Sequence, residues 1–299
     1  MRADSRSKLA GVVLALAALL GLGLRPTAQA AEGVRGLRVW QGAEVRHLLT
    51  PALAGTLHLT PTAEFVVLGD AQAILLTAAG DLFDLANRQA VPAEEPLQLD
   101  AFADSAGVLV TIRGDRLGWL ADGRVRERIR LPAAGLRLAA GARQRLYLYG
   151  PQGEGSVVYL LDENRVLLLL QIPHGEISAL TAIGERLFFA VGNVIYTVAT
   201  GERPALTFVA HGEDRIRSLV PDPATGLLYF SAGKAVYAMR AGVAIAILRG
   251  LAGYLRYSQG ALYVLDPLER RLVRLSGLEK LTGAGPAEIP VPPPATLKE

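Results

Sequence analysis

The feature that most constrains the fold of this chain is an internal repeat of about 40 residues. Six segments of similar form begin at regular intervals, and their first residues are Leu57, Leu97, Leu136, Ile177, Ile216 and Leu255. Successive starts are separated by 40, 39, 41, 39 and 39 residues. A near-constant period of this size indicates one supersecondary unit repeated along the chain, with neighbouring units burying a common core.

Each unit predicts four short strands. The fourth unit contains the runs ISAL (177–180), RLFFAV (186–191), VIYTVA (194–199) and ALTFVA (205–210), separated by turns that contain Gly, Asn and Pro. The runs are rich in Val, Ile, Phe, Tyr and Thr, which favour strands. Their apolar residues do not recur at the spacings of three and four that an amphipathic helix requires. We therefore expect an all-β chain with very little helix.

A four-stranded unit of this length fits one blade of a closed β-propeller, and an open solenoid is the alternative. The runs VLLLLQI (166–172) and VAIAIL (243–248) are almost continuously apolar, as expected for blades that pack on both faces. The ends of the chain favour the closed form. The segment 37–55 resembles 235–253, which holds the third and fourth strands of a unit, whereas the last unit shows only three strands.

An N-terminal strand that completes the last blade would close the ring and remove its unpaired edges. The predicted fold is therefore a single six-bladed β-propeller of four-stranded antiparallel blades, closed by an N-terminal strand. One strand is left over in this assignment, so a ring of seven blades is the alternative.

The N-terminal segment has the pattern of a secretory signal. Arg2, Arg6 and Lys8 precede the uncharged run Leu9–Leu24, and small residues lead up to Ala30. We expect cleavage after Ala30 and export to the periplasm or beyond the cell, with no membrane-spanning segment left; an uncleaved anchor is the alternative. The predicted domains are a signal peptide (1–30), the propeller (31–282) and a Pro-rich tail (283–299).

Composition excludes several classes of function. The chain has no cysteine, so disulfides, zinc–thiolate sites and thiol catalysis are ruled out. The formal net charge is only +3, and the arginines of the segment 124–130 alternate with Val, Glu and Ile. That alternation predicts one solvated strand face and no nucleic-acid partner. No G-x-S-x-G, P-loop or dinucleotide fingerprint occurs, and we assign no catalytic residue.

Two strand segments carry a family resemblance. RLYLYG (145–150) and ALYVLD (261–266) resemble repeats of six-bladed propellers of the NHL, TolB-like and gluconolactonase-like kind. The resemblance extends over residues 35–276 and implies a fold without a particular activity. The gluconolactonase-like group holds calcium with Glu, Asn and Asp side chains in the channel. The three asparagines of this chain, Asn87, Asn164 and Asn193, lie in predicted turns between outer strands, so that ligand pattern is missing.

Polar residues recur near the start of each predicted first strand, where it meets the central channel. These residues are His58, Gln98, Arg137, Ser178, Arg217 and Arg256. Together they predict a positively charged channel mouth that binds carboxylates or phosphates through guanidinium groups. The alternative is that they line a water-filled channel and pair with nearby acids. A register slip of one residue would also move this column elsewhere.

The triplet His-Gly-Glu occurs twice, in equivalent loops of adjacent units. His174, Glu176, His211 and Glu213 could therefore share one patch, and two histidines with two carboxylates have the chemistry of a divalent metal site. The alternative is that duplicated loops carry the same turn residues. We predict no cofactor, and a divalent metal stays an open alternative.

The predicted function is that of an exported, non-catalytic propeller that binds another molecule on its loop face. The expected partner is an envelope or extracellular protein, or a small anionic ligand. The alternative is a metal-assisted hydrolase or lactonase on the same fold.

Overall fold

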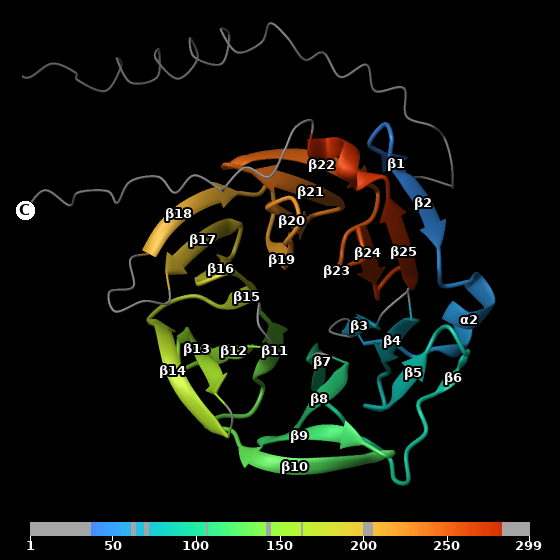
Figure 1. The fold of residues 1–299 in the computed structure, drawn as a ribbon, viewed down its shortest axis with the longest axis vertical. Helices are drawn as coiled ribbons and strands as arrows, with labels where there is room; N and C mark the ends of the chain where they lie inside the picture. Colours follow the sequence, from blue (N-terminus) through green and yellow to red (C-terminus); the bar gives the residue numbers. More distant parts are fainter. Residues whose placement is uncertain are drawn as a thin grey trace, which may run out of the picture.

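The computed structural model describes residues 37–60, 64–68, 72–105, 107–141, 145–162, 164–199 and 206–282. Within these ranges the chain forms six antiparallel sheets arranged as blades around one axis (Figure 1). The predicted six-bladed β-propeller is therefore confirmed. The predicted signal peptide and the predicted Pro-rich tail lie outside the described residues. No helix in the described part combines the length and the apolar character that a membrane span requires.

Each blade is a meander whose strands follow one another outward from the axis. Blade 1 contains β3 (Phe65–Leu68), β4 (Gln72–Leu76), β5 (Leu82–Asp84) and β6 (Gln89–Ala90). Blade 2 contains β7 (Ala101–Ser105), β8 (Val108–Arg113), β9 (Arg116–Ala121) and β10 (Arg124–Arg130). Blade 3 contains β11 (Arg137–Ala140), β12 (Leu146–Gln152), β13 (Gly155–Asp162) and β14 (Arg165–Ile172).

The remaining three blades repeat this order. Blade 4 contains β15 (Ile177–Ile183), β16 (Arg186–Val191), β17 (Val194–Ala199) and β18 (Leu206–His211). Blade 5 contains β19 (Ile216–Asp222), β20 (Leu227–Ala232), β21 (Ala235–Arg240) and β22 (Val243–Arg249). Blade 6 contains β23 (Tyr254–Ser258), β24 (Ala261–Asp266) and β25 (Arg271–Ser276), followed by the 3₁₀ helix η2 (Leu278–Thr282).

The N-terminal part of the chain closes the ring. Strand β2 (Glu44–His47) pairs with β25 as the outermost strand of blade 6, with Glu44 opposite Ser276. The left-over strand of the sequence is β1 (Arg38–Val39), which pairs with β22 and makes blade 5 a five-stranded sheet. A seventh blade is therefore not formed, because β1 and β2 each complete an existing blade. Helix α2 (Pro51–Thr56) then leads the chain to blade 1.

The core lies between the blades and not at the axis. In the described part of the chain, each pair of successive blades encloses one cluster of buried apolar side chains. Between blades 3 and 4, for example, Tyr147, Val158 and Phe189 are almost fully buried, and Phe189 stacks on Tyr196 with 5.7 Å between ring centroids. Apolar surface buried between sheets in this way supplies most of the stabilisation of the ring.

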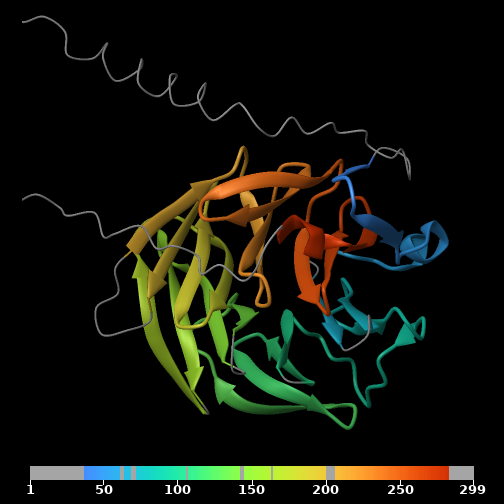
Figure 2. The same ribbon diagram turned by 45° about the horizontal axis from the view of Figure 1, so that its top comes forward.

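The outermost strands depart from the expected packing. VLLLLQI and VAIAIL belong to β14 and β22, at the perimeter of the ring, together with β18 (Figures 1 and 2). Leu168 is 58% exposed, Phe208 54% and Val243 69%. The expectation that these runs pack on both faces was wrong, because blades radiate from the axis and the space between neighbouring sheets widens outward.

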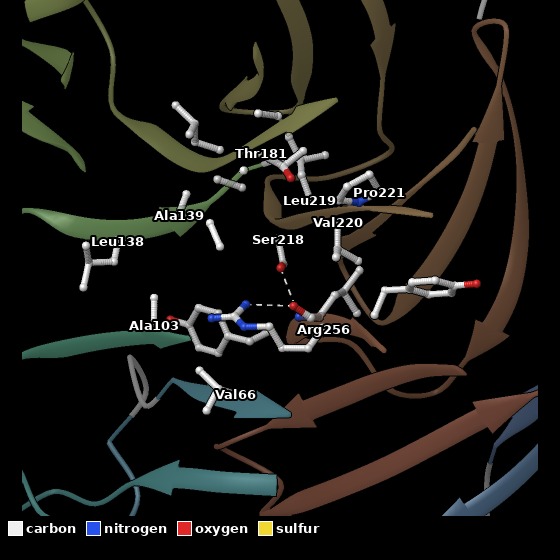
Figure 3. Close-up of a pocket in the computed structure, with 18 of the residues that line it drawn as sticks. Val66, Ala103, Leu138, Ala139, Thr181, Ser218, Leu219, Val220, Pro221 and Arg256 are labelled. Atoms are coloured by element: carbon white, nitrogen blue, oxygen red, sulfur yellow. Dashed lines mark hydrogen bonds between the residues drawn. The ribbon is translucent and has the colours of Figure 1, made fainter. Parts of the chain in front are cut away.

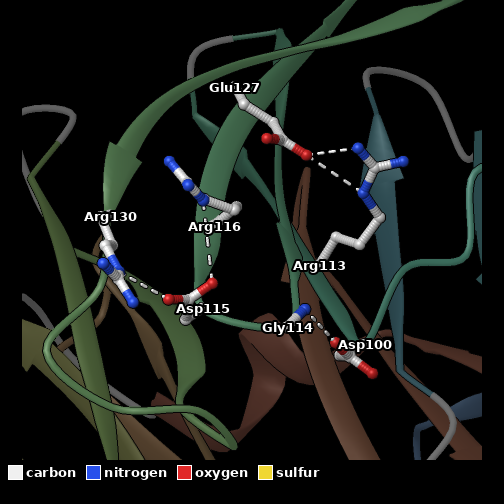
Figure 4. A network of polar contacts seen from close by, with 7 residues as sticks. All are labelled: Asp100, Arg113, Gly114, Asp115, Arg116, Glu127 and Arg130. Atoms are coloured by element: carbon white, nitrogen blue, oxygen red, sulfur yellow. Dashed lines mark hydrogen bonds and ion pairs between the residues drawn. The ribbon is translucent and has the colours of Figure 1, made fainter.

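The arginine-rich strand β10 is solvated, as its alternating pattern predicts. Arg130 Nε donates to Asp115 Oδ2 at 2.8 Å, and Glu127 pairs with Arg113 of β8, the next strand but one in the blade (Figure 4). Arg128 lies over the ring of Trp119, with 5.1 Å from its guanidinium carbon to the ring centroid. Exposed pairs of this kind contribute little to stability.

Candidate functional site

The register of the innermost strands decides which side chains reach the centre. The inner strands of blades 3 to 6 begin within one residue of the predicted starts. Blades 1 and 2 differ, because β3 begins only at Phe65 and β7 at Ala101. The apolar–polar–apolar patterns around His58 and Gln98 belong to irregular segments that precede those strands. Both side chains are exposed and lie outside the lining of the central cavity.

A cavity of about 600 Å³ occupies the centre of the ring, a size common for small-molecule sites. Small and aliphatic side chains from four inner strands form much of its wall (Figure 3): Val66, Ala103, Leu138, Ala139, Leu219 and Val220. The Arg256 side chain extends from the sixth inner strand into the space among them (Figure 3). The alanines leave room that larger residues would fill.

A group of polar side chains, here called the central cluster, gathers at one end of this cavity. It consists of Glu64, Arg137, Tyr149, Arg217, Tyr254 and Arg256, contributed by blades 1, 3, 5 and 6. All but Arg137 line the cavity directly, and Arg137 is opposite Tyr149 in the pairing of β11 with β12. The structure thus brings together three of the predicted mouth residues, Arg137, Arg217 and Arg256.

Glu64 is the buried carboxylate of the central cluster. Its side chain is only 8% exposed, and Oε2 lies 4.0 Å from Arg256 Nη2. No donor in the described part of the chain lies within hydrogen-bond distance of Oε2. Burial raises the pKa of Glu64, and the positive charges of Arg256 and Arg137 act in the opposite direction. Burial, together with the charge of Glu64, also raises the pKa of Tyr149 to about 12.

Arg256 is held in place by groups of its own strand and of blade 1. Its Nη1 donates to the carbonyl oxygen of Leu255 at 2.8 Å. Its guanidinium carbon lies 5.4 Å from the centroid of the Phe65 ring, a cation–π arrangement. Arg217, by contrast, is exposed. One arginine is therefore pre-positioned inside the cavity and another is accessible to solvent.

Ser178, the remaining predicted mouth residue, joins two blades. Its hydroxyl is buried and donates to the carbonyl oxygen of Ile216 at 2.6 Å, which links β15 to β19. Ser156 and Ser218 make the same kind of link, since each hydroxyl accepts from a backbone N–H of the next blade. Buried polar groups need such partners. The sequence could not distinguish this interblade bond from a side chain directed at the axis.

The four residues of the predicted metal site have separate neighbours. His174 Nδ1 lies 3.6 Å from Glu154 Oε2, and Glu176 accepts from Arg215 at 2.6 Å. Glu213 accepts from the hydroxyl of Tyr237 at 3.2 Å, and His211 ends strand β18. Among the described residues, no three His, Asp or Glu side chains are grouped so that they could hold one ion. The metal site stays a prediction.

The calcium that the family resemblance implies does not fit the donor set at the axis. Glu64 and Asp104 are the carboxylates among the described residues that line the cavity. Calcium requires six to eight oxygen ligands. Here Glu64 is surrounded by guanidinium groups, whose positive charge opposes a cation, and Asp104 already accepts from the backbone N–H of Gly107 at 2.9 Å. The centre of this ring is suited to anions.

Glu64, Tyr149 and Tyr254 were missed by the sequence analysis. The first strand of this unit was expected to start near Leu57, so Glu64, which directly precedes the apolar run FVVL (65–68), was not considered. Taking that run as the inner strand would have aligned Glu64 with Arg137, each at the start of an inner strand. The tyrosines have no such signal, because strand tyrosines are common in the sheets of this chain.

The raised pKa of Glu64 predicts a specific pH dependence of stability. A carboxyl group that is more basic in the folded protein favours folding at low pH, and this contribution is lost as the pH rises from about 4.5 through the folded-state pKa. Glu64→Gln has no carboxyl group at this position and therefore lacks this pH-dependent contribution. The free energy of unfolding of the variant minus that of wild type should then rise by about 1.4 kcal/mol for each pH unit between about pH 4.5 and the folded-state pKa. Urea unfolding of both proteins from pH 4 to pH 8 measures this difference in stability. A difference that stays constant or falls as the pH rises would contradict a raised pKa of Glu64.

Comparison with known proteins identifies the fold alone. No protein-family model and no curated protein matches the chain. A gluconolactonase from Xanthomonas campestris is similar in structure, with a TM-score of 0.62 and 14% identity, over 85% of this chain and 99% of that one. A protein provisionally assigned as a gluconolactonase has a TM-score of 0.61 at 15% identity, over 79% of this chain and 92% of that one. Virginiamycin B lyase from Staphylococcus aureus has a TM-score of 0.54 at 13% identity, over 71% of this chain and 79% of that one.

Proposed function

We propose that this six-bladed propeller is an exported binding module that takes a small carboxylate or phosphate at the central cluster. The observation that carries the proposal is the meeting of Arg137, Arg217 and Arg256, from three different blades, around Tyr254 and beside the Glu64 carboxylate in a cavity of about 600 Å³. The signal-like pattern of residues 1–30 adds export to the proposal.

The charges and burial of the site support an anionic ligand. The central cluster contains three guanidinium groups and one carboxylate, so it has an excess of positive charge. Guanidinium groups bind carboxylates and phosphates through two parallel hydrogen bonds, and such charge-assisted bonds are stronger away from bulk water. Arg217 would meet the ligand at the solvent side, and Arg256, which is 29% exposed, would hold it inside.

Removal of these guanidinium groups should weaken the binding of simple anions. We expect the double variant Arg217→Gln and Arg256→Gln to bind phosphate, sulfate or acetate at least about tenfold more weakly than wild type, since one charged hydrogen bond is worth about 1.5–3 kcal/mol. Isothermal titration calorimetry measures the affinities. Arg215→Gln is the matched control, because this exposed arginine pairs with Glu176 and lies outside the cavity lining. Equal weakening by the control variant, or no binding by wild type, would refute the proposal.

Hydrolysis of a lactone is the second candidate function. It is supported by the structural similarity to gluconolactonases and by Glu64, whose raised pKa and burial in a cavity are typical of a general base. The test is the hydrolysis of gluconolactone and related lactones, with and without added Ca²⁺, Mg²⁺ or Zn²⁺. A catalytic role predicts turnover by wild type and a loss of at least about 100-fold in Glu64→Gln. If the protein hydrolyses these lactones no faster than the uncatalysed reaction, the lactonase function is wrong and the binding module is the remaining candidate.

A further inference from the structure

Several residues of the central cluster lie where the inner strands begin, and apolar side chains follow them along the cavity. Every blade begins with its inner strand, so the six inner strands run in one direction along the channel. Glu64 directly precedes β3, Arg137 is the first residue of β11, and Tyr254 is the first residue of β23. Glu64, Arg137 and Tyr254 therefore lie at the end of the cavity where the inner strands begin.

Beyond the central cluster the wall is mostly apolar. Val66, Ala103, Leu138 and Leu219 face the same space from four different blades (Figure 3). The hydroxyl of Ser218, also in this wall, already accepts from the backbone N–H of Leu255 at 3.0 Å. A ligand whose anionic end sits on the arginines would therefore place the rest of its body against aliphatic groups. Burial of an apolar body on that wall is favourable, whereas burial of an unpaired polar group there is costly.

Glu64 adds a second requirement at the charged end. Its carboxylate is more than nine-tenths buried, and Oε2 has no hydrogen-bond donor among the described residues. A buried carboxylate oxygen without a donor is unfavourable, so a ligand that supplies one gains affinity. Because Oε2 is 4.0 Å from Arg256 Nη2, the donor and the ligand's anionic group must be close neighbours in the ligand.

We infer that the ligand is a hydrophobic carboxylic acid that carries a hydroxyl or ammonium group on the carbon next to its carboxylate. The carboxylate binds Arg217 and Arg256, the neighbouring donor binds Glu64, and the apolar body lies along Val66, Leu138 and Leu219. This inference rests on the proposed anion-binding function and adds the two ligand features that the arginines alone do not specify.

Four probes test the inference on the full-length protein. They are 3-phenyllactate, phenylalanine, 3-phenylpropionate, which lacks the donor, and lactate, which lacks the apolar body. We expect 3-phenyllactate or phenylalanine to bind at least about tenfold more tightly than both 3-phenylpropionate and lactate, since charged hydrogen bonds and buried apolar groups each contribute at this level. The tighter of the two favoured probes identifies the donor as hydroxyl or ammonium.

Two variants separate the contribution of the hydrogen-bond donor from that of the apolar body of the ligand. Glu64→Gln should reduce the preference for the donor-bearing acid over 3-phenylpropionate to less than about threefold, because the donor loses its charged acceptor. Val220 belongs to the same apolar wall (Figure 3), so Val220→Asn should weaken binding of the phenyl-bearing probes and leave lactate unchanged. Val243→Asn, on the exposed strand β22, is the matched control and should change neither affinity. Near-ultraviolet circular dichroism establishes that each variant is folded.

The outcomes distinguish the inference from the function on which it rests. If 3-phenylpropionate or lactate binds wild type as tightly as the favoured acids, while simple anions still bind in an arginine-dependent manner, the inference is wrong and anion binding stands. If no anion binds in an arginine-dependent manner, both are wrong. The comparison among probes on wild type is decisive even where a variant fails to fold.

Discussion

A protein that begins at residue 48, and therefore lacks β1 and β2, is expected to unfold about 10–20 °C below one that begins at residue 37. Strand β2 pairs with β25, so its loss leaves blade 6 with an unpaired edge. Burial of Leu37 and partial burial of Val39, Trp40 and Val45 are also lost. Together these side chains contribute roughly 5 kcal/mol, which in a domain of this size corresponds to the stated shift in Tm.

Thermal unfolding followed by circular dichroism measures this difference. The protein that begins at residue 37 is the control, since it retains both strands and all of the described ring. A synthetic peptide of residues 42–49 added to the shorter protein should recover part of the lost stability, because it can pair with the free edge of β25. Equal unfolding temperatures of the two proteins would show that the ring does not depend on its N-terminal closure.

The second prediction with a large effect compares the loss of stability when a bulky apolar residue is removed near the axis and when one is removed at the perimeter. Phe189→Ala is expected to lower the free energy of unfolding by about 3–5 kcal/mol, because its ring is fully buried and the substitution leaves a cavity. Leu168→Ala should cost less than about 0.5 kcal/mol, since this side chain of the outermost strand β14 is 58% exposed. Urea unfolding at equilibrium gives both values.

This pair of substitutions tests where the core ends. A large loss in Leu168→Ala would mean that another surface covers the outer strand in solution. A small loss in Phe189→Ala would contradict the packing between blades 3 and 4. Tyr196, which stacks on Phe189, provides a further check: Tyr196→Leu should cost less than Phe189→Ala, because its side chain is only partly buried.

The central cluster shows how far sequence reasoning could reach toward a site. Arg137, Arg217 and Arg256 occupy similar places in their repeat units, so the period alone predicted that they would converge on the axis. Glu64 escaped this reasoning because the connection before β3 is longer than in later blades and shifted the assumed strand start. Whether these groups bind a ligand is decided by the titrations proposed above.

The sequence by itself determined the period of the repeat, the all-β class, the six repeat units and the closing strand at the N-terminus. These features depend on residue patterns within about 40 positions and on a truncated last unit that needs one more strand. The tertiary structure alone decided the register of the first two inner strands, the pairing of β1 with β22 and the exposure of the outer strands. It also decided that a buried carboxylate faces the arginines. Those features depend on contacts between blades. The alternation of residues along a strand indicates which side chains share a face, but not which neighbours they contact or how far from the axis they lie.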